Sequence, residues 1–470
     1  MHNNDQSPLA LGHLQELWDH RVRSGVDITS RLIKQGSAHK RELERARRQQ
    51  LKISKARRKL SNKRLSSSDR ATLLQDIKKR RKKYGRAIAA YLSCVQADLL
   101  APNFKLAVVA NFKPQHVTKQ SYSLHTGSPD SDYFAALILS DTLATAFGLH
   151  APSRHEAVAG LAAAVSGAWT KSIVRVDISS FYENIPHDRL LELIDSNKAL
   201  DSISKRWIRT LLAAYLQASS STNTIGLPRG IGPSANLSEA YLLQFDKSLE
   251  TKRECIYYSR FVDDIVAVMA EADPYPARPT SYLDEIDSLL VDIGLTASTA
   301  TGKRQEINVV REILPRGQKI TYLGYDLELD YADPALSLDI SAQRYMRIVT
   351  KMTRAGDAYA RSKSNQGKSV ELLDLRLKYL TTNTRLLHSK RDAFVGIKFS
   401  NTLVNTSNSM RALDAELRAQ LSSLDQTGMP EVMKNRINSY SFLAGFEIPK
   451  YSRFSSGQWR AMTAIWKDVT

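Results

Sequence analysis

The sequence predicts an α+β fold in which a central region of strands and helices lies between two helical regions. Residues 1–100 have a helical, strongly basic pattern, and residues 100–330 alternate short β-branched strands with helices. From about residue 341 the apolar side chains return at helical spacing. The 470 residues suffice for two to four structural units around a substantial core, and the sequence contains no internal repeat.

The strands and helices of the central region are recognised by their periodicity. Period-two alternation and β-branched residues predict strands at 104–112, 172–178 and 320–329, the last with a glycine inside it. Apolar residues at helical spacing predict helices at 133–149, 186–194, 204–216 and 234–249. Pro186 fits the first turn of its helix, and Ser234 fits an N-cap.

Composition excludes several classes of protein. A hydrophobic content of 42% and a charged content of 24% are typical of a soluble globular chain. The N-terminus has no basic segment followed by an apolar run, and the most apolar stretch, residues 160–169, is too short to span a bilayer. We therefore expect no signal peptide and no membrane. Cys94 and Cys255 lie outside any Cys/His cluster, which argues against zinc or disulfides and predicts a cytoplasmic location.

The net charge of +19 is concentrated in one segment of the chain. Residues 31–90 hold 22 Lys/Arg and four Asp/Glu, whereas the remainder is nearly neutral. A long basic helix is predicted over 39–65, and clustered cations of this kind release counterions from phosphates, so the segment predicts contact with a nucleic-acid backbone. A solvated helix face or a disordered arm remains open. The candidate residues are Arg57, Arg58, Lys59, Lys78, Lys79, Arg80, Arg81, Lys82 and Lys83.

Two adjacent acids, Asp263 and Asp264, interrupt the apolar stretch YSRFVDDIVAV (258–268). The flanking residues 253–261 and 264–270 are predicted to pair as an antiparallel hairpin with the acids at its turn. Asp177 ends the β-branched strand SIVRVDI, and three carboxylates converge if that strand lies beside the hairpin.

A cluster of three carboxylates is unstable by itself because like charges repel. Hard divalent cations, which prefer oxygen ligands, make it favourable. Two magnesium ions about 3.5–4 Å apart would clamp the attacking and leaving oxygens of an in-line phosphoryl transfer. The alternative is a surface hairpin that carries an Asp-Asp turn without bound metal.

Together these stretches resemble the motifs of reverse transcriptases. VDISSFYENI (176–185) is similar to the first palm motif, and GLPRGIGPS (226–234) is similar to the second, with arginine in place of the usual glutamine. FVDD (261–264) is similar to the third, with phenylalanine in place of tyrosine. Residues 289–307 and YLGY (322–325) are similar to the fourth motif and to the primer grip. The likeness covers roughly residues 100–330 in the correct order and spacing.

The resemblance implies an RNA-directed DNA polymerase, a nucleotidyltransferase with a right-hand fold. The expected domains are a basic helical extension (1–95), fingers (96–170), a palm with an antiparallel sheet and the catalytic motifs (171–335), and a helical thumb (336–470). Two Mg²⁺ ions, or Mn²⁺ in their place, are the implied cofactors. The implied catalytic residues are Asp177, Asp263 and Asp264, and the implied metal ligands are these three together with the backbone carbonyl of Ile178.

Contacts to nucleotide and primer also follow from the resemblance. Tyr182 stands where the family has an aromatic residue beneath the incoming sugar, which excludes a 2′-hydroxyl and favours DNA synthesis. Arg229 is longer than glutamine and only donates, and Phe261 lacks a hydroxyl, so template and primer handling are expected to differ from those of an ordinary copying enzyme. The implied nucleotide-binding set is Phe181, Tyr182, Arg229, Gly230 and Lys303, with Lys113 and Lys119 as candidates for the triphosphate. The implied primer grip is Tyr322, Leu323 and Gly324.

Among reverse transcriptases, the motifs most resemble the bacterial branch of group II introns and retrons, and within it the abortive-infection and antiphage-defence enzymes. This resemblance implies a dedicated noncoding RNA, dNTP substrates and a DNA product, with a partner defence protein or a homo-oligomer as further partners. Two alternatives remain open. One is a template-independent or non-canonically templated polymerase on the same palm, and the other is an RNA-binding scaffold whose palm is only structural.

Overall fold

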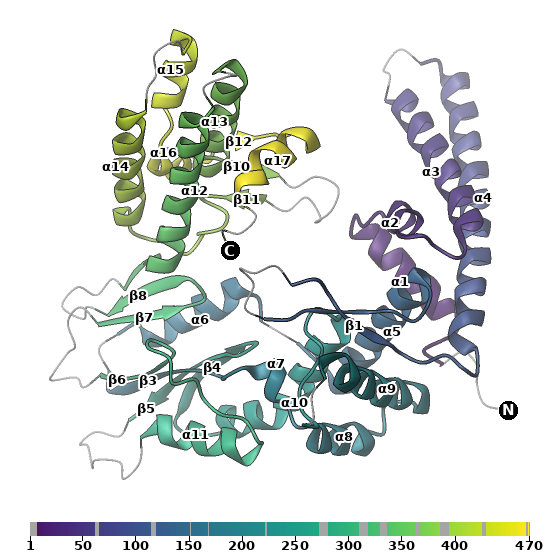
Figure 1. Ribbon diagram of the computed structural model, residues 1–470, viewed down its shortest axis with the longest axis horizontal. Helices are drawn as coiled ribbons and strands as arrows, with labels where there is room; N and C mark the ends of the chain where they lie inside the picture. The colour runs from purple at the N-terminus through teal and green to yellow at the C-terminus, as the bar shows by residue number, and fades with distance from the viewer. Residues whose placement is uncertain are drawn as a thin grey trace. The chain divides into compact units, whose positions relative to one another are not determined.

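The computed structural model describes the 470-residue chain except for fourteen short segments (Figure 1). The described residues are 7–61, 65–113, 119–150, 152–167, 169–220, 223–271, 281–309, 318–329, 336–362, 366–385, 394–424, 429–466 and 469. Helices and antiparallel strands alternate in this part of the chain, so the predicted α+β fold is confirmed. The chain divides into a first unit, residues 1–150 and 180–244, and a second unit, residues 151–179 and 245–470.

The described residues of the first unit form helices, their connecting loops and one pair of short strands. Its helices are α1 (Leu11–Arg23), α2 (Ile28–Gln35), α3 (Lys40–Leu60), α4 (Ser67–Leu100), α5 (Pro129–Phe147), α7 (Phe181–Asn184), α8 (His187–Ser196), α9 (Ser202–Ser219) and most of α10 (Gly232–Glu250). Strand β1 (Val108–Ala110) pairs antiparallel with β2 (Tyr122–Leu124). The strand predicted over 104–112 is therefore much shorter than its pattern indicates.

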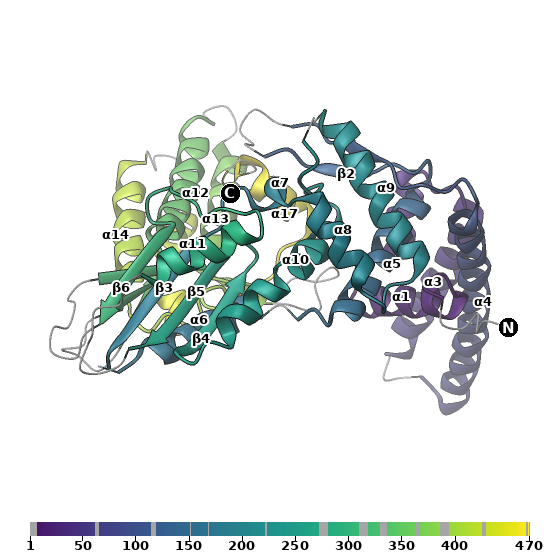
Figure 2. The same cartoon turned by 90° about the horizontal axis from the view of Figure 1, so that it is seen from below.

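Helices α3 and α4 lie side by side as a long hairpin, which both Figure 1 and Figure 2 show. A small apolar seam of Ile53, Ala56 and Ile77 joins them. The basic residues lie outside this seam, so the hairpin buries its few apolar side chains and leaves most of its cations in solvent. The predicted helix over 39–65 ends at Leu60, and residues 62–64 lie outside the described residues.

The second unit is built on a four-stranded antiparallel sheet in the order β4–β5–β3–β6. Its strands are β3 (Lys171–Asp177), β4 (Cys255–Phe261), β5 (Asp264–Ala270) and β6 (Arg304–Val309). The predicted hairpin of β4 and β5 is confirmed, and so is its position beside the strand that carries Asp177. The register places Asp177 directly opposite Asp264.

Different helices and strands pack against the two faces of this sheet. Helix α6 (Arg154–Val165) and the hairpin of β7 (Gln318–Tyr322) and β8 (Tyr325–Leu329) lie on one side, and α11 (Tyr282–Asp292) lies on the other (Figure 1). Ile173, Val266 and Val268 point into the first layer. Because side chains alternate along a strand, Arg175 and Asp177 share the face of Ile173, and Asp264 shares that of Val266. The apolar face therefore becomes polar at the end of β3.

The strand that carries Asp177 begins at a buried lysine. Lys171 is fully buried, and its ammonium donates to the carbonyl oxygens of Val165 (2.7 Å) and Gly167 (2.6 Å) at the end of α6. Cations at a helix C-terminus interact favourably with its unpaired carbonyls. Burial lowers the pKa of Lys171 to about 8, so the side chain is still mostly charged at neutral pH. This contact fixes the start of β3 relative to α6.

The C-terminal part of the second unit is mostly helical, as the sequence predicts. Its elements are β9 (Ser337–Ile340), α12 (Ala342–Ala360), α13 (Gln366–Thr381), β10 (Asn383–Arg385), β11 (Phe394–Gly396), α14 (Asn408–Ser423), α15 (Glu431–Asn438), α16 (Phe442–Glu447), β12 (Tyr451–Ser452), α17 (Ser456–Thr463) and a 3₁₀ turn (Ala464–Trp466). The small sheet β11–β10–β12 is the exception to the predicted helical pattern. Within the described residues, no helix combines the length and the apolar character needed to cross a membrane.

Three local predictions were wrong. The single strand predicted over 320–329 is a hairpin, because Leu323 (φ 46°) and Gly324 (φ 76°) both adopt left-handed backbone and reverse the chain in two residues. Ser234 is not an N-cap, since α10 begins at Gly232 and the serine hydroxyl donates to the carbonyl of Pro228. Pro186 is the N-cap residue of α8 rather than part of its first turn.

Candidate active site

The Asp-Asp hairpin has a two-residue turn in a strained backbone conformation. Phe261 pairs with Asp264, which leaves Val262 and Asp263 as the turn. Val262 has a φ of 62°, in the left-handed region that costs a β-branched residue about 1–3 kcal/mol. Two hydrogen bonds hold the turn: Arg260 Nη1 donates to the Val262 carbonyl at 2.9 Å, and the Ile178 amide donates to the Asp263 carbonyl at 2.8 Å. Neighbouring groups therefore fix the position of Asp263.

Arg260 is itself held by a buried ion pair. Its Nε and Nη2 donate to the two carboxylate oxygens of Asp246 at 2.9 and 2.8 Å, and its side chain is only 5% exposed. The Tyr258 hydroxyl donates to the same carboxylate at 2.6 Å. Burial, and next the Asp246 charge, raise the pKa of Tyr258, so it remains a donor. This bidentate clamp connects the hairpin to the end of α10.

Asp264 uses both of its carboxylate oxygens in a second buried pair. Arg175 Nε and Nη2 each donate to one of them at 2.9 Å, and Arg175 Nη1 donates to the Gly302 carbonyl. Burial raises the pKa of Asp264, the Arg175 contact opposes that shift, and the charge of Asp177 adds to it. The guanidinium therefore favours the charged form of Asp264 and opposes the effects of burial and of the second carboxylate.

Backbone and side-chain contacts both fix Asp177. Its amide donates to the Lys303 carbonyl at 2.9 Å, and its carbonyl accepts from the Ser298 amide at 2.7 Å. The Lys303 ammonium donates to Asp177 Oδ1 at 2.6 Å. The carboxylate is 13% exposed, whereas the lysine is 43% exposed. Lys303 therefore balances the charge of Asp177 from the solvent side, where its side chain can move at little cost.

These contacts decide which predicted ligands suit a metal ion. Within the described residues, no three Asp, Glu, His or Cys side chains form a preformed metal cluster, although the backbone brings the three aspartates to one edge. Both Asp264 oxygens are engaged by Arg175. Lys303 donates to one oxygen of Asp177, and its own side chain is 43% exposed. Asp263 lies on the turn of the β4–β5 hairpin, opposite the end of the strand that carries Asp177. Carboxylate oxygens are the donors that Mg²⁺ prefers, so Asp177 and Asp263 fit such an ion better than Asp264 does.

The predicted nucleotide-binding residues of the first unit form a compact group. Phe181 is fully buried, whereas Tyr182 is half-buried beneath the Arg229 guanidinium, which lies 4.7 Å from its ring centre. Arg229 also donates to both carboxylate oxygens of Glu183 at 3.1 Å, and Lys119 lies 3.9 Å from that carboxylate. Phe181 is therefore a core residue, whereas the ring of Tyr182 is held by its stacking contact with the Arg229 guanidinium.

Gly230, in the same loop, has a φ of 99°, and a Cβ there would lie 3.1 Å from the Tyr122 carbonyl. Its neighbour Arg229 accepts a backbone hydrogen bond from the Tyr122 amide at 2.7 Å. The glycine thus permits the loop to lie directly against β2.

The predicted primer-grip residues lie at the turn of the β7–β8 hairpin. Tyr322 is fully buried, so its ring belongs to the core. The Leu323 carbonyl accepts from Arg154 Nε at 2.6 Å, and the ring of Tyr325 lies between Arg154 (4.9 Å) and Arg344 (5.2 Å). Burial, and next the Arg154 charge, lower the pKa of Arg344 to about 10. Leu323 and Gly324 therefore form a backbone turn bordered by two arginines.

Sequence reasoning missed several of these partners. Arg175 had a signal, because an arginine inside an apolar strand two residues before Asp177 must share the face of that acid. Arg154 and Arg344 are distant in sequence from the turn that they border, and no local pattern connects them to it. The pairing of Arg260 with Asp246 likewise depends on tertiary packing.

Comparison with known families supports the interpretation of this edge. Residues 140–327 match the family model of the reverse transcriptases, described as RNA-dependent DNA polymerases. The chain carries a reverse transcriptase domain. The match contains the three aspartates, Tyr182, Arg229, Lys303 and the β7–β8 turn, so the predicted enzyme class, an RNA-directed DNA polymerase, is confirmed.

Solved structures similar to the chain include three telomerases, each at 11% sequence identity. The match to apo telomerase of Candida tropicalis truncated from its C-terminal domain covers 60% of this chain and 74% of the telomerase chain, with a TM-score of 0.35. Telomerase of Candida albicans with a TWJ fragment of telomeric RNA covers 82% and 69%, with a TM-score of 0.34. Apo telomerase of Candida tropicalis covers 95% and 80%, with a TM-score of 0.34. No curated protein matches the chain.

The two ion pairs of the reverse transcriptase domain are expected to differ in their contribution to stability. Arg175→Met leaves the buried Asp264 carboxylate unpaired, which costs about 3 kcal/mol. Lys303→Met breaks a pair whose lysine is 43% exposed, a position that water can take, which costs about 1 kcal/mol. The midpoint of thermal unfolding should therefore fall much further for the first variant, and Arg175→Met with Asp264→Asn should recover part of the loss. Equal losses for the two single variants would contradict this assignment.

Proposed function

We propose that the chain adds deoxynucleotides to a primer 3′ end, with Asp177 and Asp263 as the principal ligands of divalent metal ions. The observation that carries this proposal is the fixed position of Asp177, at the end of β3 and opposite the hairpin whose strained Val262–Asp263 turn precedes Asp264, inside a reverse transcriptase domain. Bound divalent ions would lower the pKa of the primer hydroxyl and stabilise the charge on the triphosphate and leaving group.

The neighbouring side chains prepare this edge for that chemistry. Arg175 orients Asp264 through two hydrogen bonds, so this carboxylate supports the site as a positioning residue. Lys303 balances the charge of Asp177 and is exposed enough to move toward a negatively charged substrate. Phosphate oxygens are acceptors for such an ammonium group, which makes Lys303 our candidate contact to the triphosphate.

We assign sugar selection to Tyr182. Its ring is held by the Arg229 stack, and Arg229 is held by Glu183, so the ring is supported on the side of the second motif. A ring fixed beneath the incoming sugar would exclude a 2′-hydroxyl. Phe181, fully buried, supports the short helix α7 from within.

The domain assignment is part of the same proposal. The extension (1–95) holds α1 to α3 and most of α4, and the fingers (96–170) hold the β1–β2 pair, α5 and α6. The palm (171–335) contains the four-stranded sheet and its motifs, and the thumb (336–470) contains the helices from α12 onward. The Leu323–Gly324 turn, bordered by Arg154 and Arg344, is our candidate primer grip.

A template-independent or non-canonically templated polymerase is the second candidate function. The observation in its favour is Arg229, whose guanidinium is engaged by Glu183 and Tyr182, so it cannot act as the usual glutamine does. Sequencing the product separates the two candidates, because a defined complement of the copurified RNA requires a template, whereas a homopolymer or simple repeat does not.

The α3–α4 hairpin is our candidate for RNA binding. Eight of the nine predicted backbone contacts are exposed, and the ninth, Arg80, is half-buried and paired with Asp76 at 2.7 Å. We propose that this hairpin holds a dedicated noncoding RNA and that the chain acts in phage defence in the cytoplasm, with a partner defence protein or a second copy. The defence setting rests on the resemblance of the motifs to the antiphage-defence enzymes. An RNA-binding scaffold without catalysis is the alternative.

Loss of either proposed ligand should abolish DNA synthesis. Asp177→Asn and Asp263→Asn are each expected to lower incorporation of labelled dNTPs, with Mg²⁺ and copurified nucleic acid, by at least about a thousandfold, because each removes a charged ligand. Glu371→Gln removes an exposed carboxylate of the same unit outside the motifs and should leave incorporation unchanged. Wild-type incorporation by both ligand variants would contradict the ligand assignment, whereas full biological activity of both variants without incorporation would support the scaffold instead.

Charge removal from the α3–α4 hairpin should reduce the salt dependence of RNA binding. The test variant replaces Lys78, Lys79, Lys82 and Lys83 with glutamine. The fall of the logarithm of the RNA association constant with the logarithm of the salt concentration should become less steep by up to about 3, since each lost phosphate contact contributes roughly 0.7–0.9 to that slope. The matched control replaces four exposed cations elsewhere: Lys198, Lys247, Arg253 and Lys368. A similar decrease in the control, or an unchanged slope in the hairpin variant, would rule out the hairpin as the contact.

A further inference from the structure

A cleft of about 570 Å³ lies within the first unit, between the N-terminal helices α1 and α2, helix α5, strand β2 and the start of α10. Its volume is in the range of small-molecule and cofactor sites. None of the three aspartates lines it, and all of its lining residues belong to the first unit. Gly230 of the predicted nucleotide-binding set lines the cleft, so the cleft borders the loop of the second motif but lies outside the proposed metal ligands.

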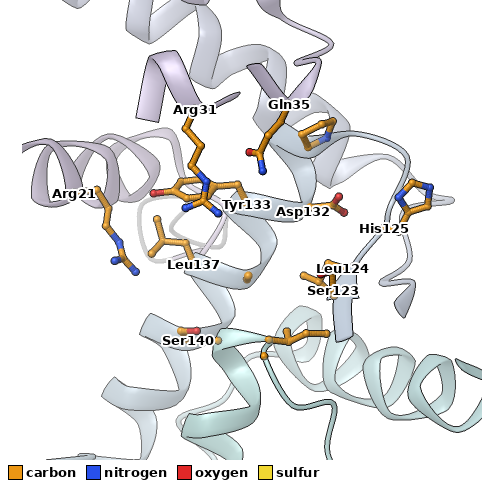
Figure 3. A pocket seen from close by; sticks show the side chains of 15 residues that line it. Arg21, Arg31, Gln35, Ser123, Leu124, His125, Asp132, Tyr133, Leu137 and Ser140 are labelled. Atoms are coloured by element: carbon orange, nitrogen blue, oxygen red, sulfur yellow. The ribbon is translucent and has the colours of Figure 1, made fainter. Parts of the chain in front are cut away.

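Two arginines give this cleft a positive edge. Arg21 of α1 and Arg31 of α2 project into the same space as Tyr133 of α5 (Figure 3). Within the described part of the chain, neither guanidinium forms an ion pair with a carboxylate. The acid that lines the cleft, Asp132, accepts hydrogen bonds on one oxygen from the amide (2.6 Å) and hydroxyl (2.7 Å) of Thr126. The positive charge of the two arginines is thus available to an anion.

A flat surface lies next to this charge. The Arg31 guanidinium lies 5.5 Å from the ring centre of Tyr133, and Leu137 continues the apolar surface along α5. Burial raises the pKa of Tyr133, while the charges of Arg21 and Arg31 oppose that shift. Arginine planes and aromatic rings are the surfaces on which unpaired bases stack.

The remaining polar groups of the cleft can both donate and accept. Gln35, His125 and Ser140 line it with an amide, an imidazole and a hydroxyl (Figure 3). Helix α10, 19 residues long, begins at Gly232, which lines the cleft too. The positive end of this helix dipole adds to the charge of the arginines.

We propose that this cleft binds one nucleoside phosphate, with the phosphate at Arg21 and Arg31 and the base against the Arg31–Tyr133 surface. Paired cations account for the phosphate, the flat surface accounts for the base, and the mixed donors and acceptors suit a base edge. The nucleotide is either free in solution or one residue of a single-stranded RNA. Binding here does not depend on the proposed polymerase reaction.

Equilibrium dialysis of the full chain in EDTA tests the proposal, because removal of divalent metal suppresses nucleotide binding at the aspartates. The probes are AMP, adenosine and a 12-nucleotide oligoadenylate RNA. The test variant combines Arg21→Gln with Arg31→Gln. The control combines Arg23→Gln with Lys34→Gln, which removes the same charge from exposed positions of the same helices outside the cleft.

We expect AMP or the oligonucleotide to bind the wild type at least tenfold more tightly than adenosine does. The test variant should lose at least tenfold in affinity for AMP or the oligonucleotide. The control should lose less than twofold. Binding of AMP identifies a free nucleotide as sufficient, and binding of the oligonucleotide alone identifies a nucleotide within a strand. The proposal is overturned if neither probe binds the wild type, if adenosine binds as tightly as AMP and the oligonucleotide, or if the test variant and the control bind equally.

Discussion

Antiparallel pairing of β3 with β5 is the constraint on which the candidate active site depends. The register sets Asp177 opposite Asp264 and places Arg175 on the same face as both. A shift of one residue would turn Asp177 and Arg175 to the opposite face and separate the acid from the hairpin turn. The bidentate Arg175–Asp264 pair, only 9% and 13% exposed, would lose its geometry in any other register. The same contact therefore stabilises the register and orders the acids.

Charge balance around this edge follows a simple rule. Each buried carboxylate has a cationic partner, and the more exposed the partner, the more readily it can move aside. Arg260 and Arg175 are almost fully buried and serve the architecture, through Asp246 and Asp264. Lys303 is largely in solvent, so Asp177 is the acid that can most easily exchange its cation for a metal ion.

Much of the active site was predictable because its signals are local. An apolar strand that ends in Asp177, and a hairpin that carries Asp263 and Asp264, can be recognised within a few residues of sequence. The β7–β8 hairpin was missed because its turn uses Leu323 in a left-handed conformation, where asparagine or glycine would have signalled the turn. The small C-terminal sheet was missed because its strands are only two or three residues long.

Long-range partners could not be predicted for a different reason. Arg154 reaches the Leu323 carbonyl from a helix that precedes it by 169 residues, and no periodicity encodes such a contact. Arg229 was recognised as a departure from the family pattern, but its engagement by Glu183 requires the fold of the loop around it. Sequence therefore identified the chemistry, whereas tertiary packing determined which side chains remain available for it.

Binding of Mn²⁺, measured by electron paramagnetic resonance in the presence of a dNTP, tests the central claim most directly. The account predicts that the wild type binds Mn²⁺, that Asp177→Asn and Asp263→Asn each lose most of that binding, and that Glu371→Gln retains it. Binding by both ligand variants equal to that of the wild type would contradict the claim that this edge of the sheet holds the metal ions.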